Sequence, residues 1–211
     1  MREKPVIIIG AGGHGKVLLD ILLDTGIQVI GFLDNDAALR GKEIFGIPIL
    51  GKDEEIVRYQ SDEVKLVNGI GSVGVATLRR SVYEKFKAQG FHFRQVIHPS
   101  AVISQRAFLE EGVQVMAGAV INIGSRIEED TIINTRASVD HDCRIGKHVH
   151  IAPGVTLSGG VSVGDETLIG TGSSVIQGVS IEERVLVGAG SNVIGNISDN
   201  YKGYGNPIRF T

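Results

Sequence analysis

Aliphatic residues recur at every sixth position through the second half of the chain. The series starts at Ile103 and ends at Val193, and each of its sixteen members is Val, Ile or Leu. These three residue types make up 63 of the 211 residues, so an unbroken series of this length at one phase indicates a structural repeat.

A second series, two residues earlier in each hexad, runs from Ala101 to Ile197 and holds small or β-branched residues. One large and one small inward residue per six describe a flat strand followed by a sharp corner. Three such segments close a triangular coil, and stacking at roughly 4.8 Å gives about five coils. No residue is inserted in this phase, so we expect no long loop to leave the prism. Glycines expected near its corners are Gly118, Gly124, Gly146, Gly164, Gly170 and Gly188.

The first half of the chain instead alternates short apolar runs with helical patterns. The expected strands cover residues 6–9, 28–33, 64–68 and 93–97, while the expected helices follow the first glycine turn and cover 54–59 and 75–88. This pattern predicts an α/β domain over residues 1–98, a short Rossmann-like βαβ unit. An all-β repeat domain with a C-terminal tail follows over residues 99–211.

The first expected strand is followed by G-x-G-x-x-G at residues 10–15. This spacing is found at dinucleotide sites, where backbone N–H groups and a helix N-terminus bind phosphate. A dehydrogenase is disfavoured, because the α/β part has room for only one mononucleotide-binding half. Glycines that merely let the helix pack on the strand are one alternative, and a nucleotide or nucleotide-sugar site is the other. His14 favours the second, since it can donate to a phosphate, and Asp34 or Asp36 can accept from a base or ribose.

Charge and composition exclude several other classes of protein. Lys and Arg total 21 against 24 Asp and Glu, a net charge of -3, so there is no positive field to gather nucleic acid or anionic lipid. The single cysteine, Cys143, excludes an intrachain disulfide and fits a reducing compartment. No apolar run approaches the roughly 20 residues of a membrane span, and no signal peptide is visible. We therefore expect a cytoplasmic protein without membrane insertion.

Candidate chemistry in the repeat lies between residues 139 and 150. The hexad register turns Cys143 inward, so we expect it to behave as a small apolar residue, whereas His141, His148 and His150 face outward. These histidines are solvated surface, ligands of a metal, or a general base. The H-x-H spacing does not match that of known zinc-binding β-helices, and we expect no metal. An imidazole has a pKa near neutrality, and the adjacent Asp142 can stabilise its charged form.

Several motifs add a resemblance that covers nearly the whole chain. They are GAGGHG at residues 10–15, FLDND at 32–36, NGIG at 68–71, HPSA at 98–101, the hexads, and NPIR near the end. In these the chain resembles the bacterial sugar acetyltransferases of the NeuD and PglD type. The resemblance implies a left-handed parallel β-helix and a homotrimer, with acetyl-CoA in the groove between two prisms.

The resemblance also implies roles for individual residues. His141 matches the general base and Asp142 its acidic partner, which is glutamate in some members and so one methylene longer. Acetyl-CoA contacts are implied for His150, Gly159, Thr171 and Ala189, with the backbone N–H of Gly159 facing the thioester oxygen. Contacts with a nucleotide-linked amino sugar are implied for Gly12, Gly13, His14, Asp34, Asn35, Asp36 and Gly71. Asn35 replaces an acid of some relatives, which leaves the nucleotide base open.

The reaction expected from the resemblance is N-acetylation of the C4 amine of a UDP-, GDP- or dTDP-linked 4-amino-4,6-dideoxyhexose by acetyl-CoA. O-Acetylation of sialic acid or a related sugar would use the same base and donor and is the alternative. From a different class, a trimeric scaffold would need no coenzyme A at all.

Overall fold

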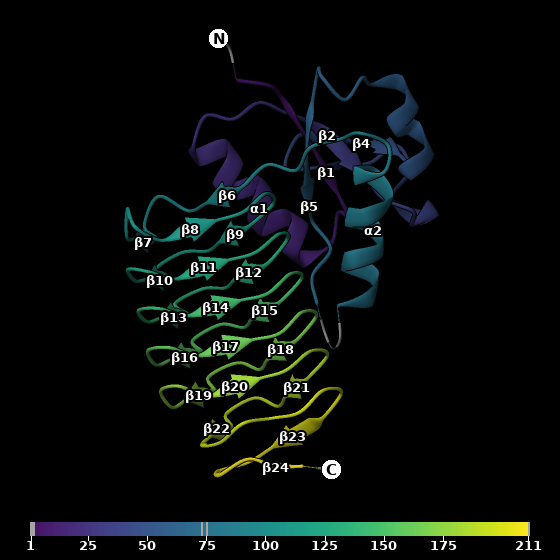
Figure 1. Cartoon of the computed structure of the whole chain (residues 1–211). Helices are drawn as coiled ribbons and strands as arrows, with labels where there is room; N and C mark the ends of the chain where they lie inside the picture. The colour runs from purple at the N-terminus through teal and green to yellow at the C-terminus, as the bar shows by residue number, and fades with distance from the viewer. Residues whose placement is uncertain (1–2, 73, 75, 211) are drawn as a thin grey trace. The chain divides into compact units, whose positions relative to one another are not determined.

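The computed structural model describes residues 3–72, 74 and 76–210 (Figure 1). The chain divides into two compact units. The first runs up to Gly71 and also includes Ser81–Val96, and the second comprises Ser72–Arg80 together with the chain from Ile97 onward. The boundary therefore falls within the second helix, α2 (Thr77–Lys87).

The first unit is built on a five-stranded sheet of order β3-β4-β2-β1-β5, in which only β3 is antiparallel to its neighbour. The strand β1, which lies between β2 and β5, is fully buried, as its run of Val and Ile requires of a strand covered on both faces. Besides α2, the unit contains β1 (Val6–Ile9), α1 (Gly13–Asp24), β2 (Val29–Leu33), the 3₁₀ turn η1 (Ala37–Leu39), β3 (Glu43–Ile44), β4 (Ile47–Gly51), the 3₁₀ helix η2 (Asp53–Arg58) and β5 (Lys65–Asn68).

Two details of this unit differ from the sequence interpretation. The β3–β4 hairpin was not predicted, although its two turn residues, Phe45 and Gly46, both have positive φ, as a tight hairpin turn requires. The expected strand over 93–97 is reduced to an isolated bridge from Phe93 to Leu66, and Val96–Ile97 instead form β6 in a sheet of the repeat. Val75, the expected start of the second helix, lies outside the described residues.

The second unit is the predicted prism. Its strands β7 to β22 are two residues long, form three parallel sheets, and pair residues 18 apart, such as Val120 with Ser138 (Figure 1). The strands are β7 (Val102–Ile103), β8 (Phe108–Leu109), β9 (Gln114–Val115), β10 (Val120–Ile121), β11 (Arg126–Ile127), β12 (Ile132–Ile133), β13 (Ser138–Val139), β14 (Arg144–Ile145), β15 (His150–Ile151), β16 (Thr156–Leu157), β17 (Ser162–Val163), β18 (Leu168–Ile169), β19 (Ser174–Val175), β20 (Ser180–Ile181), β21 (Leu186–Val187) and β22 (Asn192–Val193), with β23 (Lys202–Tyr204) and β24 (Arg209–Phe210) closing one sheet.

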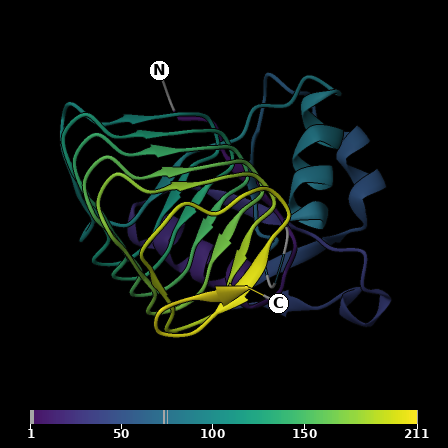
Figure 2. The same ribbon diagram turned by 60° about the horizontal axis from the view of Figure 1, so that its bottom comes forward.

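Figure 2, a view toward the C-terminal end of the stack, shows the triangular course of the coils. Residues of both hexad series fill the core inside them. Polar members of the small-residue series are buried without loss of hydrogen bonding. Ser125 donates to the carbonyl of Asp140 at 2.6 Å and accepts from the N–H of Cys143 at 3.1 Å. Thr131 and Thr167 make equivalent pairs of bonds. These hydroxyls therefore join consecutive coils from inside the prism. The stacked parallel sheets and the first α/β unit confirm the expected fold class, an α/β domain followed by a left-handed β-helix.

Each corner of the prism between residues 112 and 190 places one residue in the left-handed region. Every sixth residue from Gly112 to Gly190 has a φ between 54° and 77°. Of the glycines expected at the corners, only Gly118 and Gly124 belong to this series. The other four are needed for space rather than for φ: a Cβ on Gly170, for example, would lie 2.6 Å from the backbone nitrogen of Ala189 in the next coil.

Six residues of this left-handed series are not glycine, which the sequence pattern did not reveal. They are Asp130, Arg136, Asp142, His148, Glu166 and Arg184.

None of the helices within the described residues is long and apolar enough to cross a bilayer.

Candidate active site

His141 and Asp142 lie together on an exposed corner between β13 and β14. Their side chains are 58% and 72% exposed, and Nδ1 of His141 lies 2.9 Å from Oδ2 of Asp142. Since a carboxylate can only accept, Nδ1 carries the shared proton and the lone pair of Nε2 is left to act as a base. The contact that the sequence left undecided is therefore made.

The surroundings of His141 strengthen it as a base. The hydrogen bond to Asp142 raises the pKa of the imidazole above its ordinary value, and the negative charge of Asp140 raises it further. Both effects stabilise the imidazolium that forms when the ring accepts a proton.

Two glycines in the neighbouring coils make room for this pair. Gly159 stands 18 residues after His141, and a Cβ built on it would lie only 2.5 Å from Nε2 of the ring. Gly124 stands 18 residues before Asp142, and a Cβ there would overlap the carboxylate oxygen Oδ1. The imidazole therefore lies over the Gly159 backbone. Among the described residues, no backbone acceptor is found for the Gly159 N–H.

His150 on β15 is not the exposed side chain that its outward register suggests. Its Nδ1 donates to the carbonyl of Ser72 at 3.2 Å, and its Nε2 accepts from Nδ2 of Asn134 at 3.0 Å. Burial lowers the pKa of His150 to about 4, with the charge of Arg79 acting in the same direction. The ring is thus neutral, and both of its nitrogens are engaged within the unit.

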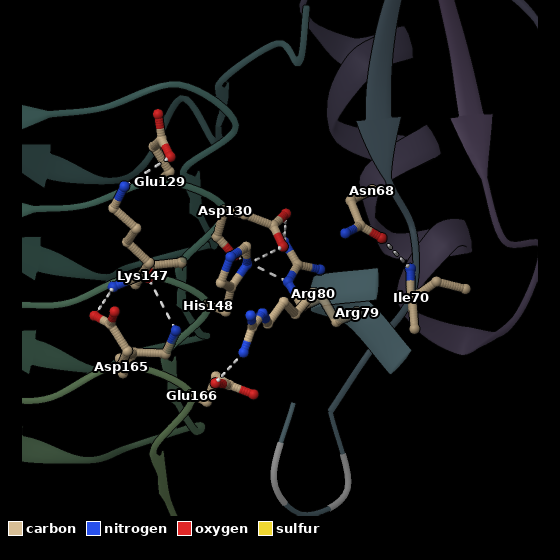
Figure 3. Close-up of polar contacts among 12 residues, drawn as sticks. Asn68, Ile70, Arg79, Arg80, Glu129, Asp130, Lys147, His148, Asp165 and Glu166 are labelled. Atoms are coloured by element: carbon tan, nitrogen blue, oxygen red, sulfur yellow. Dashed lines mark hydrogen bonds and ion pairs between the residues drawn. The ribbon is translucent and has the colours of Figure 1, made fainter. Parts of the chain in front are cut away.

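His148, also expected at the surface, lies in a buried ion-pair cluster (Figure 3). Its Nδ1 lies 3.0 Å from Oδ2 of Asp130, whose other oxygen accepts from Nη2 of the fully buried Arg79 at 2.7 Å. Arg80 pairs with Glu166 one coil further on at 2.8 Å. Hexad register correctly turned His148 out of the prism, but it carried no information that Arg79 and Arg80 would lie at this corner.

Two other candidates for acetyl-CoA contacts lie on a different corner. Thr171, between β18 and β19, and Ala189, between β21 and β22, are exposed and stand 18 residues apart, one coil above the other. The corner of His141 and Gly159 instead follows β13 and β16. A single chain therefore does not gather these candidates into one cleft.

The glycine loop and the acidic strand end gather at the carboxyl edge of the first sheet. Gly12 caps α1 without a side-chain bond, and a Cβ on either Gly12 or Gly13 would meet nothing within 4 Å. Gly71, which follows β5, lies against His14, since a Cβ on this glycine would be 3.4 Å from that of the histidine. The N-terminus of α1 is thus an open site of the kind that binds phosphate.

The three polar residues after β2 have distinct partners. Both oxygens of Asp34 are engaged, one by the N–H of Ala11 at 2.7 Å and the other by the N–H of Asp36 at 2.8 Å. Asp34 therefore ties the glycine loop to the end of β2. Asn35 accepts from the N–H of Asp53 at 3.2 Å through its Oδ1, and Asp36 caps η1 through the N–H of Ala38.

The free thiol of Cys143 does not lie at the surface. It is fully buried in the prism, and its thiol donates to the carbonyl of Ser158 at 3.3 Å. Burial raises the pKa of this thiol, which disfavours the thiolate that an acyl-cysteine would need.

Within the described residues, no group of three or more His, Cys, Asp or Glu is arranged to hold a metal.

Both halves of the chain match family models. The PglD N-terminal domain matches residues 5–86, and the bacterial transferase hexapeptide (six repeats) matches residues 124–159.

Solved structures match over almost the full length. PerB from Caulobacter crescentus, solved with CoA and GDP-perosamine, is 39% identical, with a TM-score of 0.91 and coverage of 100% of this chain and 98% of that one. The acetyltransferase domain of PglB from Neisseria gonorrhoeae, solved with acetyl coenzyme A, is 33% identical, with a TM-score of 0.91 and full coverage of both chains.

Curated sequences match over shorter stretches. The GDP-perosamine N-acetyltransferase of Escherichia coli O157:H7 is 26% identical over 160 residues, 72% of this chain and 69% of that protein. The 2,3,4,5-tetrahydropyridine-2,6-dicarboxylate N-succinyltransferase of Afipia carboxidovorans is 38% identical over 76 residues, and the chain spans only 25% of its length. Taken with the prism and the glycine-loop unit, these similarities show that the chain belongs to the sugar acetyltransferases of the NeuD and PglD type.

Proposed function

We propose that this protein transfers the acetyl group of acetyl-CoA to the C4 amine of a nucleotide-linked 4-amino-4,6-dideoxyhexose, with His141 as the general base. The observation that carries the proposal is the exposed corner on which Nε2 of His141 lies beside the backbone of Gly159. The complexes of PerB with CoA and GDP-perosamine and of the PglB domain with acetyl coenzyme A support the choice of donor and acceptor.

The proposed chemistry is a direct transfer. The neutral C4 amine attacks the thioester carbon, and the C–N bond forms as the carbonyl oxygen becomes an oxyanion. Nε2 of His141 accepts the proton that the nitrogen must lose, and Asp142 stabilises the resulting imidazolium. The tetrahedral intermediate then collapses, the C–S bond breaks, and the departing thiolate takes up the proton as CoA-SH.

The N–H of Gly159 is the proposed donor to the oxyanion. Such a donor commonly contributes a few kcal/mol to transition-state stabilisation. Its position supports the assignment, because the Gly159 backbone and Nε2 of His141 lie together and so both face the same reacting centre. Cys143 has no part in this route.

The donor site is proposed to form between copies of the chain in a homotrimer. His141 and Gly159 of one copy would face Thr171 and Ala189 of its neighbour, with acetyl-CoA in the groove between them. This arrangement accounts for the presence of the candidates on separate corners of one prism. His150, with both nitrogens engaged, would shape the site rather than bind through a free nitrogen.

The acceptor nucleotide is proposed to bind in the first unit. The open N-terminus of α1, with Gly12, Gly13 and His14, would hold the phosphates. Asn35 and Asp36 would lie near the base or ribose, with Asp34 fixing the loop and Gly71 lining it. The complex of PerB with GDP-perosamine makes a GDP-linked sugar the first substrate to test.

The test is release of thiol from acetyl-CoA across GDP-, UDP- and dTDP-linked 4-amino-4,6-dideoxyhexoses, with free sialic acid beside them. We expect turnover with one of the sugar nucleotides and a loss of roughly 10²- to 10⁴-fold in kcat for His141→Ala. Turnover with sialic acid alone would show that the acceptor is a hydroxyl and not an amine. A lack of thiol release with every acceptor, or full activity of a correctly assembled His141→Ala protein, would contradict the proposal.

A further inference from the structure

The carboxylate of Asp140 makes two hydrogen bonds through a single oxygen. Its Oδ1 accepts from the backbone N–H of His141 at 2.8 Å and from Nδ2 of Asn122 at 2.9 Å. Asn122 occupies the same place one coil earlier, 18 residues before Asp140. The carboxylate thus links the backbone of the histidine to the preceding coil.

The main chain at this point is held as well. The carbonyl of Asp140 accepts from the hydroxyl of Ser125 at 2.6 Å, inside the prism. Asp140 is therefore fixed from two sides, by Asn122 on the outside and by Ser125 on the inside. A residue held in this way fixes where the next residue, His141, leaves the corner.

An acid at this place is confined to the coil that carries the histidine. The corresponding residues of the other coils, at 18-residue steps, are Ser104, Asn122, Ser158, Ile176 and Ile194. The place therefore does not need a carboxylate in order to form the corner. From these contacts we propose that Asp140, held by Asn122, is a positioning residue for His141, an inference that rests on the proposed function.

Asp140 would act in two ways. By accepting from the His141 N–H it restricts the backbone, and hence the direction of the imidazole over Gly159. By its charge it favours the imidazolium. Within the described residues, the charged groups that act on His141 are Asp142 and Asp140, and the neighbouring coils present Ile123, Gly124 and Gly159 at this corner.

The ionisation of Asp140 is consistent with the second role. The hydrogen bonds from His141 and Asn122 hold the pKa of the Asp140 carboxyl below its ordinary value. The carboxylate is thus charged throughout the range in which His141 titrates.

The test separates geometry from charge with two substitutions. Asp140→Asn keeps an oxygen for the His141 N–H but removes the charge, so the pKa of His141 should fall. The acid limb of kcat/KM should move to lower pH by the same amount, with kcat reduced by no more than about threefold. Asp140→Ala also removes the acceptor, and we expect kcat to fall roughly tenfold or more with little change in the KM for acetyl-CoA. Asn122→Ala should change kcat in the same direction to a smaller extent.

The pKa of His141 is read by NMR of ¹³C-labelled histidine, with the resonance identified by its absence in His141→Ala. This readout does not need turnover, so the inference can fail separately from the proposed acetyl transfer. Glu182→Gln is the matched control, because it removes one exposed carboxylate at another corner and should leave both readouts unchanged. An unchanged His141 pKa in Asp140→Asn, together with full activity of Asp140→Ala, would overturn the inference.

Discussion

At the scale of single residues, the candidate site depends on two side chains and on two glycines whose lack of a side chain leaves room for them. His141 and Asp142 provide the base and its partner, and Gly159 and Gly124 leave the space that both occupy. Neither glycine has to be glycine for the corner to form, since the same places hold a side chain in other coils. Ile123 and Gln177 stand where Gly159 does, and Asp142 itself stands where Gly124 does.

Substitution of Gly159 tests whether the lack of a side chain there leaves the space that the His141 ring occupies. Gly159→Ala puts a methyl group against Nε2, so the ring must turn away, and we expect kcat to fall by about 10²-fold. Gly195→Ala is the control, because it changes the same position two coils later, where a Cβ meets nothing within 4 Å. The measurement is kcat for both variants alongside their melting temperatures. Equal activity of the two would mean that the ring is not held over Gly159.

The pH dependence of the reaction depends on Asp142. Only the neutral imidazole can accept a proton, so the rate should fall as pH drops through the raised pKa of His141. Asp142→Asn removes the charge that raises this pKa, and the acid limb of kcat/KM should move to lower pH. The plateau should also fall, by roughly tenfold or more, because the base is weaker and its tautomer less well fixed. A pH–rate profile of the two proteins checks this, and an acid limb that stays in place would contradict it.

At the scale of structural elements, the corners show two uses of one backbone conformation. A left-handed residue costs roughly 1 kcal/mol when it carries a side chain. At Arg136 the side chain is exposed, and the described part of the chain gives it no hydrogen bond or ion pair to offset the cost. At Asp130 the side chain accepts from the fully buried Arg79, and at Glu166 from the partly exposed Arg80, both on α2.

The same substitution at two corners should therefore have opposite effects. Arg136→Gly relieves strain and should raise the free energy of unfolding by about 0.5 to 1 kcal/mol. Asp130→Gly leaves Arg79 as an uncompensated buried charge and should lower it by roughly 3 kcal/mol or more. Denaturant unfolding at equal protein concentration measures both, and two changes of the same sign would refute the argument.

At the scale of the whole molecule, the division of the candidate site between corners has a functional consequence. His141 and Gly159 lie on one corner of the prism and Thr171 and Ala189 on another. If acetyl-CoA binds between copies, each complete site takes one corner from each of two chains. Defects on the two corners should then complement each other.

Mixing two inactive variants tests this. His141→Ala lacks the base, and Ala189→Trp is expected to block the groove with a bulky side chain. Refolding the two together at equal amounts should restore about one quarter of the wild-type activity, because a random trimer pairs two intact corners at that frequency. The same proteins refolded separately and then combined serve as the control. Absence of activity in the refolded mixture would place the whole site in one chain.

Features set by the local period could be predicted from the sequence alone. Each hexad repeats the same strand and corner, so the register turned Cys143 into the core and His141 out of it, as the structure confirms. The βαβ unit followed for the same reason, since its strands and helices are encoded by short apolar runs. The positive φ of the corners could not be predicted from glycine positions, because six of these residues are not glycine.

Contacts between distant parts of the chain required the folded structure. Hexad register places a side chain outside the prism but does not say what covers it, and the partners of His148 and His150 come from 18 and 78 residues away. The space above Gly159 and the use of both Asp34 oxygens likewise depend on neighbours brought together only by folding. A periodic sequence thus specifies the direction of each side chain, whereas burial, pKa and hydrogen bonding depend on which other segment lies against it.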